Sequence, residues 1–117
     1  MDAVNMDDRA VIIADGAGNI QFWSRGAESL LGYTADEAAG KTLDLMVPET
    51  YREQHWAGFH RAMAAGAAAM EGASFDLPVR HRDGAILECP ATFVLVRDGQ
   101  KKTIGAMAVL AAPPAVT

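Results

Sequence analysis

Apolar residues near the start of the chain occur in two short runs separated by turn-forming residues. Residues 10–14 form an apolar run that ends at the sequence Asp-Gly-Ala-Gly-Asn, and Ile20–Trp23 resumes the apolar character. Two such runs joined by Gly, Asp and Asn are typical of a β-hairpin. The pattern therefore predicts two paired, buried strands.

Two short helices are predicted next from their capping residues. Ser24 can cap one helix, which Gly32 would close in the left-handed conformation. Thr34 and Glu37 have the spacing of a capping box for a second helix that ends at Gly40.

Residues 48–63 predict a longer helix that carries a histidine within its apolar stripe. Pro48 opens it at a position where its missing N–H costs nothing. At about 100° per residue, His55 faces the apolar sector, whereas His60 lies at its edge. A neutral imidazole facing a pocket can bind haem iron, although a core histidine bonded to the backbone would show the same spacing. The sector contains Tyr51, His55, Trp56, Phe59, Ala62 and Met63, and Arg52 projects toward it.

Residues 64–72 are mostly Ala and Gly, with Gly66 ending any helix that begins there. They are either a plain loop or a mobile lid over whatever the helix binds.

From residue 73 the apolar positions recur every second residue, which predicts strands. Pro78 suggests an edge strand or a bulge. Turns at residues 82–84 and 97–100 divide this part into three strands, the second with Leu87, Cys89, Ala91, Phe93 and Leu95 on one face.

The predicted order of elements gives an α+β domain with a five-stranded antiparallel sheet and helices on one face. The helix carrying His55 would form the far wall of a cavity between the helices and the sheet. We expect a single domain over residues 8–111, with an N-terminal segment at 1–7 and a tail at 112–117 that follows Pro113 and Pro114.

Composition narrows the possible functions. The 117 residues are 50% hydrophobic with a net charge of −5 and no basic stripe, which argues against nucleic acid as a partner. No apolar run is long enough to span a membrane, and the first residues do not resemble a signal peptide. The single cysteine, Cys89, fits a reducing cytoplasm and predicts a buried apolar position. No catalytic triad, carboxylate pair or phosphate-binding glycine loop is recognisable, so we do not expect an enzyme.

Residues 15–41, DGAGNIQFWSRGAESLLGYTADEAAGK, together with the Arg-Asp-Gly turn at 82–84, resemble a PAS domain. The segment 47–55, VPETYREQH, is similar to the MPxxxRxxH motif of the haem-binding PAS domains of FixL-type oxygen sensors and direct oxygen sensor phosphodiesterases. This resemblance implies haem b, with His55 as its proximal ligand and His60 as the rival. It also implies a sensor of O₂, CO, NO or redox state. Tyr51, Phe59 and Met63 would then lie near the porphyrin, and Arg52 or Arg61 near its propionates.

The sequence departs from those sensors where bound oxygen receives a hydrogen bond. Phe75 stands in place of the oxygen-binding arginine, and Ala73 in place of a ligating methionine. Oxygen would lose a bond worth about 1.5–3 kcal/mol, and nonpolar CO far less. Met70 is either a flexible core residue or the sixth ligand. The implied distal wall consists of Met70, Phe75, Ala91 and Phe93, in which the small Ala91 leaves volume that Phe75 can occupy.

The rival hypothesis is a haem-free PAS module for dimerisation or for binding a small metabolite, with flavin as a minor variant. Either module would signal through a homodimer or a partner protein. The residues after the last strand do not predict the output helix usual in PAS sensors, so we expect a standalone module or an output region outside this sequence. A sheet face with Ile104, Ala106, Ala108 and Leu110, or the N-terminal segment, would supply the dimer contact.

Overall fold

The structure, a computed structural model, describes residues 9–114. The predicted N-terminal segment at 1–7 and the end of the predicted tail at 115–117 lie outside the described residues. Within the described part, residues 111–114 follow the last strand without helix or strand.

The chain opens with the predicted hairpin. Strands β1 (Ala10–Asp15) and β2 (Ile20–Trp23) pair antiparallel. The Asp15 carboxylate accepts hydrogen bonds from the backbone N–H groups of Ala17 and Asn19, which holds the turn. Gly18 in this turn has φ +86°, a conformation that favours glycine.

Both short helices form where their caps predict them. Helix α1 (Arg25–Leu31) begins at Ser24, whose hydroxyl accepts the N–H of Ala27, and ends at the left-handed Gly32. Helix α2 (Ala35–Ala38) begins with the predicted capping box. It ends two residues before Gly40.

The longer helix begins later than the sequence predicted. A 3-10 turn, η2 (Leu43–Leu45), precedes it, and Pro48 caps a second 3-10 turn, η3 (Glu49–Tyr51). Helix α3 (Arg52–Ala65) follows and ends at the left-handed Gly66. Tyr51 therefore precedes the α-helix rather than belonging to it.

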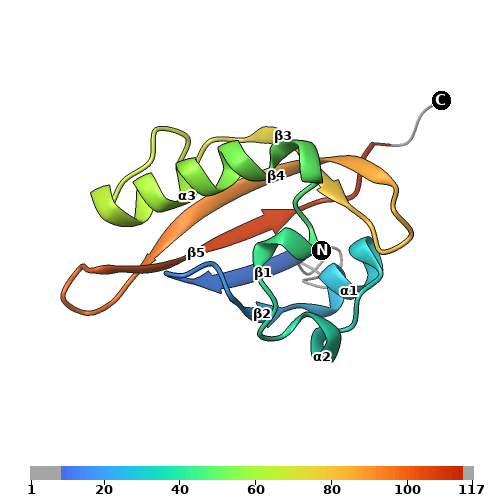
Figure 1. The fold of residues 1–117 in the computed structure, drawn as a ribbon, viewed down its shortest axis with the longest axis horizontal. Coiled ribbons are helices and arrows are strands. Elements are labelled where there is room, and N and C mark those ends of the chain that lie inside the picture. Colours follow the sequence, from blue (N-terminus) through green and yellow to red (C-terminus); the bar gives the residue numbers. More distant parts are fainter. Residues whose placement is uncertain (1–8, 115–117) are drawn as a thin grey trace, which may run out of the picture.

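The predicted five-stranded antiparallel sheet is confirmed. Strands β3 (Phe75–Arg80), β4 (Ile86–Arg97) and β5 (Thr103–Leu110) complete it in the order β2-β1-β5-β4-β3 (Figure 1). Helix α1 contacts β1, α2 contacts β2, and α3 contacts β5. Pro78 lies on the edge strand β3, where its missing N–H is tolerated.

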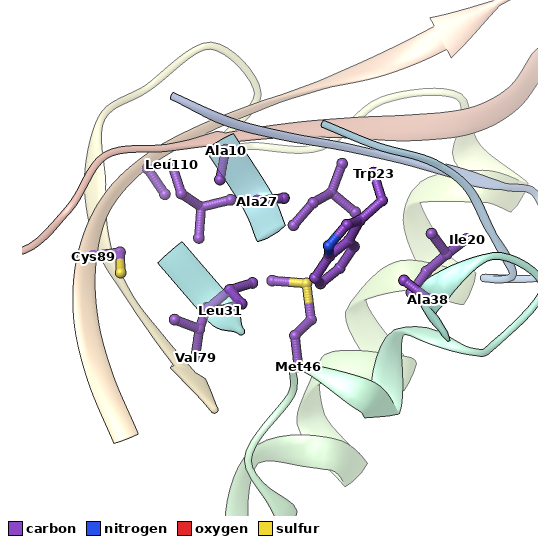
Figure 2. Packing of buried hydrophobic residues seen from close by; sticks show 12 residues of the cluster. Ala10, Ile20, Trp23, Ala27, Leu31, Ala38, Met46, Val79, Cys89 and Leu110 are labelled. Atoms are coloured by element: carbon purple, nitrogen blue, oxygen red, sulfur yellow. The ribbon is translucent and has the colours of Figure 1, made fainter. Parts of the chain in front are cut away.

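The main core lies beneath α1 and α2. Figure 2 shows its side chains gathered around Trp23 and Met46, with Cys89 buried as predicted. The Trp23 indole N–H donates to the carbonyl of Tyr33, so the buried ring keeps a polar partner.

The sheet face predicted to form a dimer contact faces the core instead. Leu110 is fully buried, Ala108 packs against the core, and Ile104 is exposed at the far end of β5. The residues that alternate with these on β5, and their cross-strand partners on β1, β2 and β4, lie on the opposite face of the sheet. We call this opposite face the outer face; its central residues are Val11, Ile13, Phe22, Thr92, Val94, Val96, Met107 and Val109.

Candidate functional site

Helix α3 turns one stripe of side chains inward, and His55 belongs to it. Phe59 and Ala62, four and seven residues further on, are buried. Residues at this spacing share one face of an α-helix. His55, which is half-buried, therefore lies on the buried side of α3.

The imidazole of His55 has no polar partner within residues 9–114. Its Nδ1 atom is buried and makes no hydrogen bond. The ring instead packs edge-on against Trp56, with centroids 4.9 Å apart, and more loosely against Phe59 at 6.0 Å. Buried polar atoms are nearly always hydrogen-bonded, so an exception calls for an explanation. The hydrogen bond to the backbone that a core histidine would make is absent from the described chain.

The surroundings keep this imidazole neutral. Burial lowers the pKa of His55 below its usual value, and the nearby His60 lowers it further. The Asp44 carboxylate opposes both effects and raises that pKa. The net direction is downward, which leaves the free base that can donate a lone pair to a metal.

Trp56 and Asp44 form a contact that motif analysis did not identify. The Trp56 indole N–H donates to the Asp44 carboxylate at 2.7 Å. The same ring lies so close to Gly18 that a Cβ atom there would collide with it. The helix wheel placed Trp56 in the apolar sector, but nothing in the sequence pointed to Asp44, which is twelve residues away.

Arg52 turns toward the apolar side of the helix, as predicted, but it is occupied there. Its guanidinium donates to the carbonyls of Val47 and Asp44, each at 3.1 Å, and lies 3.7 Å from the Asp44 carboxylate. Arg61 is exposed and makes no ion pair in the part of the chain that the structure describes. Of the two arginines expected near the propionates, Arg61 is the one that has no ion pair with another described residue.

The two phenylalanines and the alanine expected in the distal wall lie together on β3 and β4. The Phe75 and Phe93 rings meet edge to face, 6.1 Å apart. The register places Phe75 directly opposite Ala91, as expected if Phe75 fills the volume that the small Ala91 leaves. None of these three side chains carries a hydrogen-bond donor.

Two of the expected site residues do not lie with the others. Tyr51 is 39% exposed in the 3-10 turn, and Met70 is 48% exposed in the segment after α3. Met63 is half-buried on α3. His60 is exposed and stacks on Trp56 at 5.7 Å. The structure thus brings His55, Phe59 and Met63 together on one helix and leaves Tyr51 and Met70 at the surface.

The segment after α3 is tied to β4. The Glu71 carboxylate accepts the backbone N–H of Leu95 and two hydrogen bonds from Arg97. Arg97 also donates to the carbonyl of Gly66, and the N–H of Gly72 donates to the carbonyl of Phe93. A lid made of this segment would have to break the Glu71–Arg97 pair to open.

Two hollows of the surface lie elsewhere. One of about 390 Å³ is lined by residues around α2, among them Tyr33 and Lys41. The other, of about 230 Å³, lies at the ends of β4 and β5 and includes Arg9. Neither is lined by His55. Within residues 9–114, no three His, Cys, Asp or Glu side chains come together as a metal-binding group.

The charge of Asp44 gives a prediction for His55. Asp44→Asn keeps an acceptor for Trp56 but removes the charge that favours the imidazolium, so the pKa of His55 should fall further. His60→Gln should raise it, because it removes a repelling charge. Proton NMR titration of the histidine ring signals checks both directions, with the exposed Glu53→Gln on α3 as a control expected to leave the value unchanged. Equal pKa values in Asp44→Asn and the wild type would contradict the prediction.

The Glu71–Arg97 pair gives a second prediction. Hydrogen bonds from Arg97 and from the Leu95 N–H lower the pKa of Glu71 below its ordinary 4.5. A lowered carboxyl pKa stabilises the fold above the ordinary value, and that stabilisation disappears as pH falls through the lowered pKa. Glu71→Gln should therefore speed amide hydrogen exchange in residues 67–72 at pH 7, and the difference from the wild type should vanish in acid. Glu88→Gln on β4 is the matched control; equal exchange in Glu71→Gln and the wild type would show that the ion pair does not hold the segment.

Comparison with known proteins places this geometry in a family. The family described as PAS fold matches residues 6–111. The oxygen sensor protein DosP of Escherichia coli is 25% identical over 71% of this chain, and the sensor protein FixL of Bradyrhizobium diazoefficiens is 32% identical over 64%. The matched stretch is only 10% of DosP and 15% of FixL.

Solved structures agree with the fold. A PAS domain from Colwellia psychrerythraea superimposes with a TM-score of 0.75 at 21% identity, covering 92% of this chain and 90% of that one. The PAS domain of the quorum-sensing receptor RpfR from Cronobacter turicensis, in complex with BDSF, gives 0.69 at 17% identity, covering 94% and 98%. The expected resemblance is confirmed: this chain belongs to the PAS family.

Proposed function

We propose that this PAS domain is a haem-binding sensor module in which His55 is the proximal iron ligand. The observation that carries the proposal is the buried, unpartnered Nδ1 atom of His55 on the inner side of α3. A buried polar atom left without a partner costs about 1–3 kcal/mol of folding free energy, and a bond from the imidazole to a metal would offset that cost. The similarity to DosP, named as an oxygen sensor, supports this choice of ligand.

The residues around His55 fit an apolar, planar group. Haem iron takes four nitrogens from the porphyrin, so one imidazole from the protein suffices. Phe59 and Met63 would pack beside the porphyrin from α3, and Arg61 is free to pair with a propionate. Phe75, Ala91 and Phe93 would form the opposite wall. Bound haem b would supply an iron centre that binds a diatomic gas or changes its charge.

The apolar wall determines which gases the domain distinguishes. Phe75 stands where a donor would favour polar O₂, and it offers none. The domain should therefore bind CO and NO with less penalty than O₂. The exposed side chain of Met70 points to an open sixth position rather than a methionine ligand.

A haem-free module is the second candidate, and one observation favours it. Neither of the two surface hollows described above is lined by His55, so neither offers a porphyrin a place beside that ring. A small metabolite, or less readily a flavin, needs less room than a porphyrin. The PAS domain of RpfR, which has this fold, is solved in complex with BDSF, and this supports a bound small ligand as the alternative.

We propose that the domain signals as a homodimer through the outer face. That face is apolar at its centre, and Phe22 on it is 48% exposed. The sheet spans four spacings of about 4.8 Å between neighbouring strands, and its strands average about seven residues that rise about 3.3 Å each, so the face presents about 450 Å². Two copies would bury about 900 Å², close to the lower limit of about 1,000 Å² for a specific contact. Two identical faces related by a two-fold axis need no complementary charges to associate, and the central residues of the outer face carry no charge.

We also propose a cellular setting and a role for the domain. No helix within residues 9–114 is long and apolar enough to cross a membrane. The buried thiol of Cys89 suits the reducing cytoplasm, where we propose the domain works. PAS domains are sensory modules, and we propose a regulatory rather than catalytic role for this one, passed on to a partner protein.

Haemin titration separates the two candidate functions. The wild type should bind one haemin with an intense Soret band, and His55→Ala should lose the band or bind at least tenfold more weakly. His60→Ala, an exposed histidine on the same helix, is the matched control and should behave as the wild type. Loss of binding in His60→Ala but not in His55→Ala would give His60 the role, and no uptake by the wild type would favour the haem-free module.

The dimer surface is tested by placing a charge on it. Val94→Glu lies at the centre of the outer face and should convert a dimer to a monomer in sedimentation velocity, because a buried unpaired charge opposes association. Ala57→Glu, exposed on α3, is the control and should remain dimeric. A dimeric Val94→Glu, or a monomeric wild type, would contradict this choice of surface.

A further inference from the structure

We propose that Trp56 is a positioning residue for His55, held in place by Asp44 and by the close approach of Gly18. The inference deepens the proposed function and rests on it only where haemin is used as a probe. It concerns what fixes the direction in which the imidazole faces.

Hydrogen bonding does not orient His55 within the described chain. Metal-ligating histidines are usually oriented by donating their second ring N–H to a carboxylate, a carbonyl or water. The His55 side chain makes no such bond, and its Nδ1 atom is buried. Rotation of the ring is therefore limited by packing, and its nearest aromatic neighbour is Trp56, at 4.9 Å and an interplanar angle of 73°.

Trp56 is fixed at two points on its ring. The indole N–H donates to Asp44 at 2.7 Å, and the far edge of the six-membered ring fills the space where a Gly18 side chain would stand. A hydrogen bond to a charged acceptor is stronger than one between neutral groups. The ring cannot turn without breaking this bond or leaving Gly18.

The two anchor points belong to one hydrogen-bonded unit. The N–H of Leu43, next to Asp44, donates to the carbonyl of Gly18 at 3.0 Å. Asn19 and Thr42 form an isolated β-bridge beside it. The β1–β2 turn and η2 therefore hold the indole in place together, and a hydrogen bond from Arg52 to the Asp44 carbonyl joins the start of α3 to η2. The direction of the His55 ring is thus set, through Trp56, by residues outside α3.

The test compares two changes at Asp44 in the haem-free protein. Asp44→Ala removes the acceptor, so the Trp56 indole N–H signal in NMR should move and exchange with water faster. The His55 ring signals should shift and broaden as the ring samples other rotamers. Asp44→Asn keeps an acceptor oxygen and should restore both sets of signals when they are recorded at a pH at which His55 is neutral in every variant. Glu53→Ala, on the exposed side of α3, should change neither.

Unchanged His55 signals in Asp44→Ala, with the Trp56 signal clearly moved, would overturn the proposal. If Asp44→Ala does not fold, Trp56→Phe takes its place, because it keeps a ring but removes the N–H, and it should alter the His55 signals in the same way. Unchanged His55 signals in that variant would likewise overturn it.

Haemin provides the second readout. Loss of residues that orient a metal-binding histidine typically costs 10- to 100-fold in metal affinity. We expect a loss of about that size for haemin in Asp44→Ala and none in Asp44→Asn. Equal haemin affinity in Asp44→Ala and the wild type would contradict positioning of the ligand. If His55→Ala binds haemin like the wild type, the proposed function fails, while the NMR comparison still decides whether Trp56 positions His55.

Discussion

A neutral imidazole without a hydrogen-bond partner among residues 9–114, on the buried side of a helix, is the feature on which the rest of this site depends. His55 shares its face of α3 with Phe59 and Ala62, both buried. Burial removes water from the ring and lowers its pKa, so the lone pair is free and desolvated. A buried ring nitrogen without a partner destabilises a closed hydrophobic core, but a neutral imidazole with an available lone pair is suited to binding a metal.

The remaining elements hold that helix in place. Trp56 anchors it to the β1–β2 turn and to Asp44, while Arg52 binds the carbonyls that precede it. At its other end, Glu71 and Arg97 tie the following segment to β4. Movement of α3 would therefore act on the first hairpin and on the central strands together. The outer face lies on those same strands, which would give the proposed ligand-dependent shift at His55 a direct route to the proposed dimer contact.

Much of this fold could be predicted from local signals in the sequence. The Ser24 cap, the Thr34–Glu37 capping box and Gly32 each act within four residues, and each predicted its helix correctly. Alternation predicted the strands but not which of their two faces is buried. Both faces of β5 are apolar, so the side bearing Leu110 was wrongly predicted to be exposed.

The errors and omissions at the site involve contacts over longer distances. Pro48 marks a helix start in sequence, yet a 3-10 turn takes up the first residues, and Tyr51 is exposed as a result. The Asp44–Trp56 bond spans 12 residues and the Glu71–Arg97 pair 26, with no motif that signals either. His55 was proposed as the ligand because helical periodicity and family resemblance selected the same residue.

Resonance Raman spectroscopy of the reduced, haemin-reconstituted protein tests the role of His55 most directly. If His55 binds the iron, an iron–histidine stretching band should appear, shift when the protein contains ¹⁵N-labelled histidine, disappear in His55→Gly and return on adding free imidazole. A band that persists unchanged in His55→Gly without imidazole would show that another side chain holds the iron.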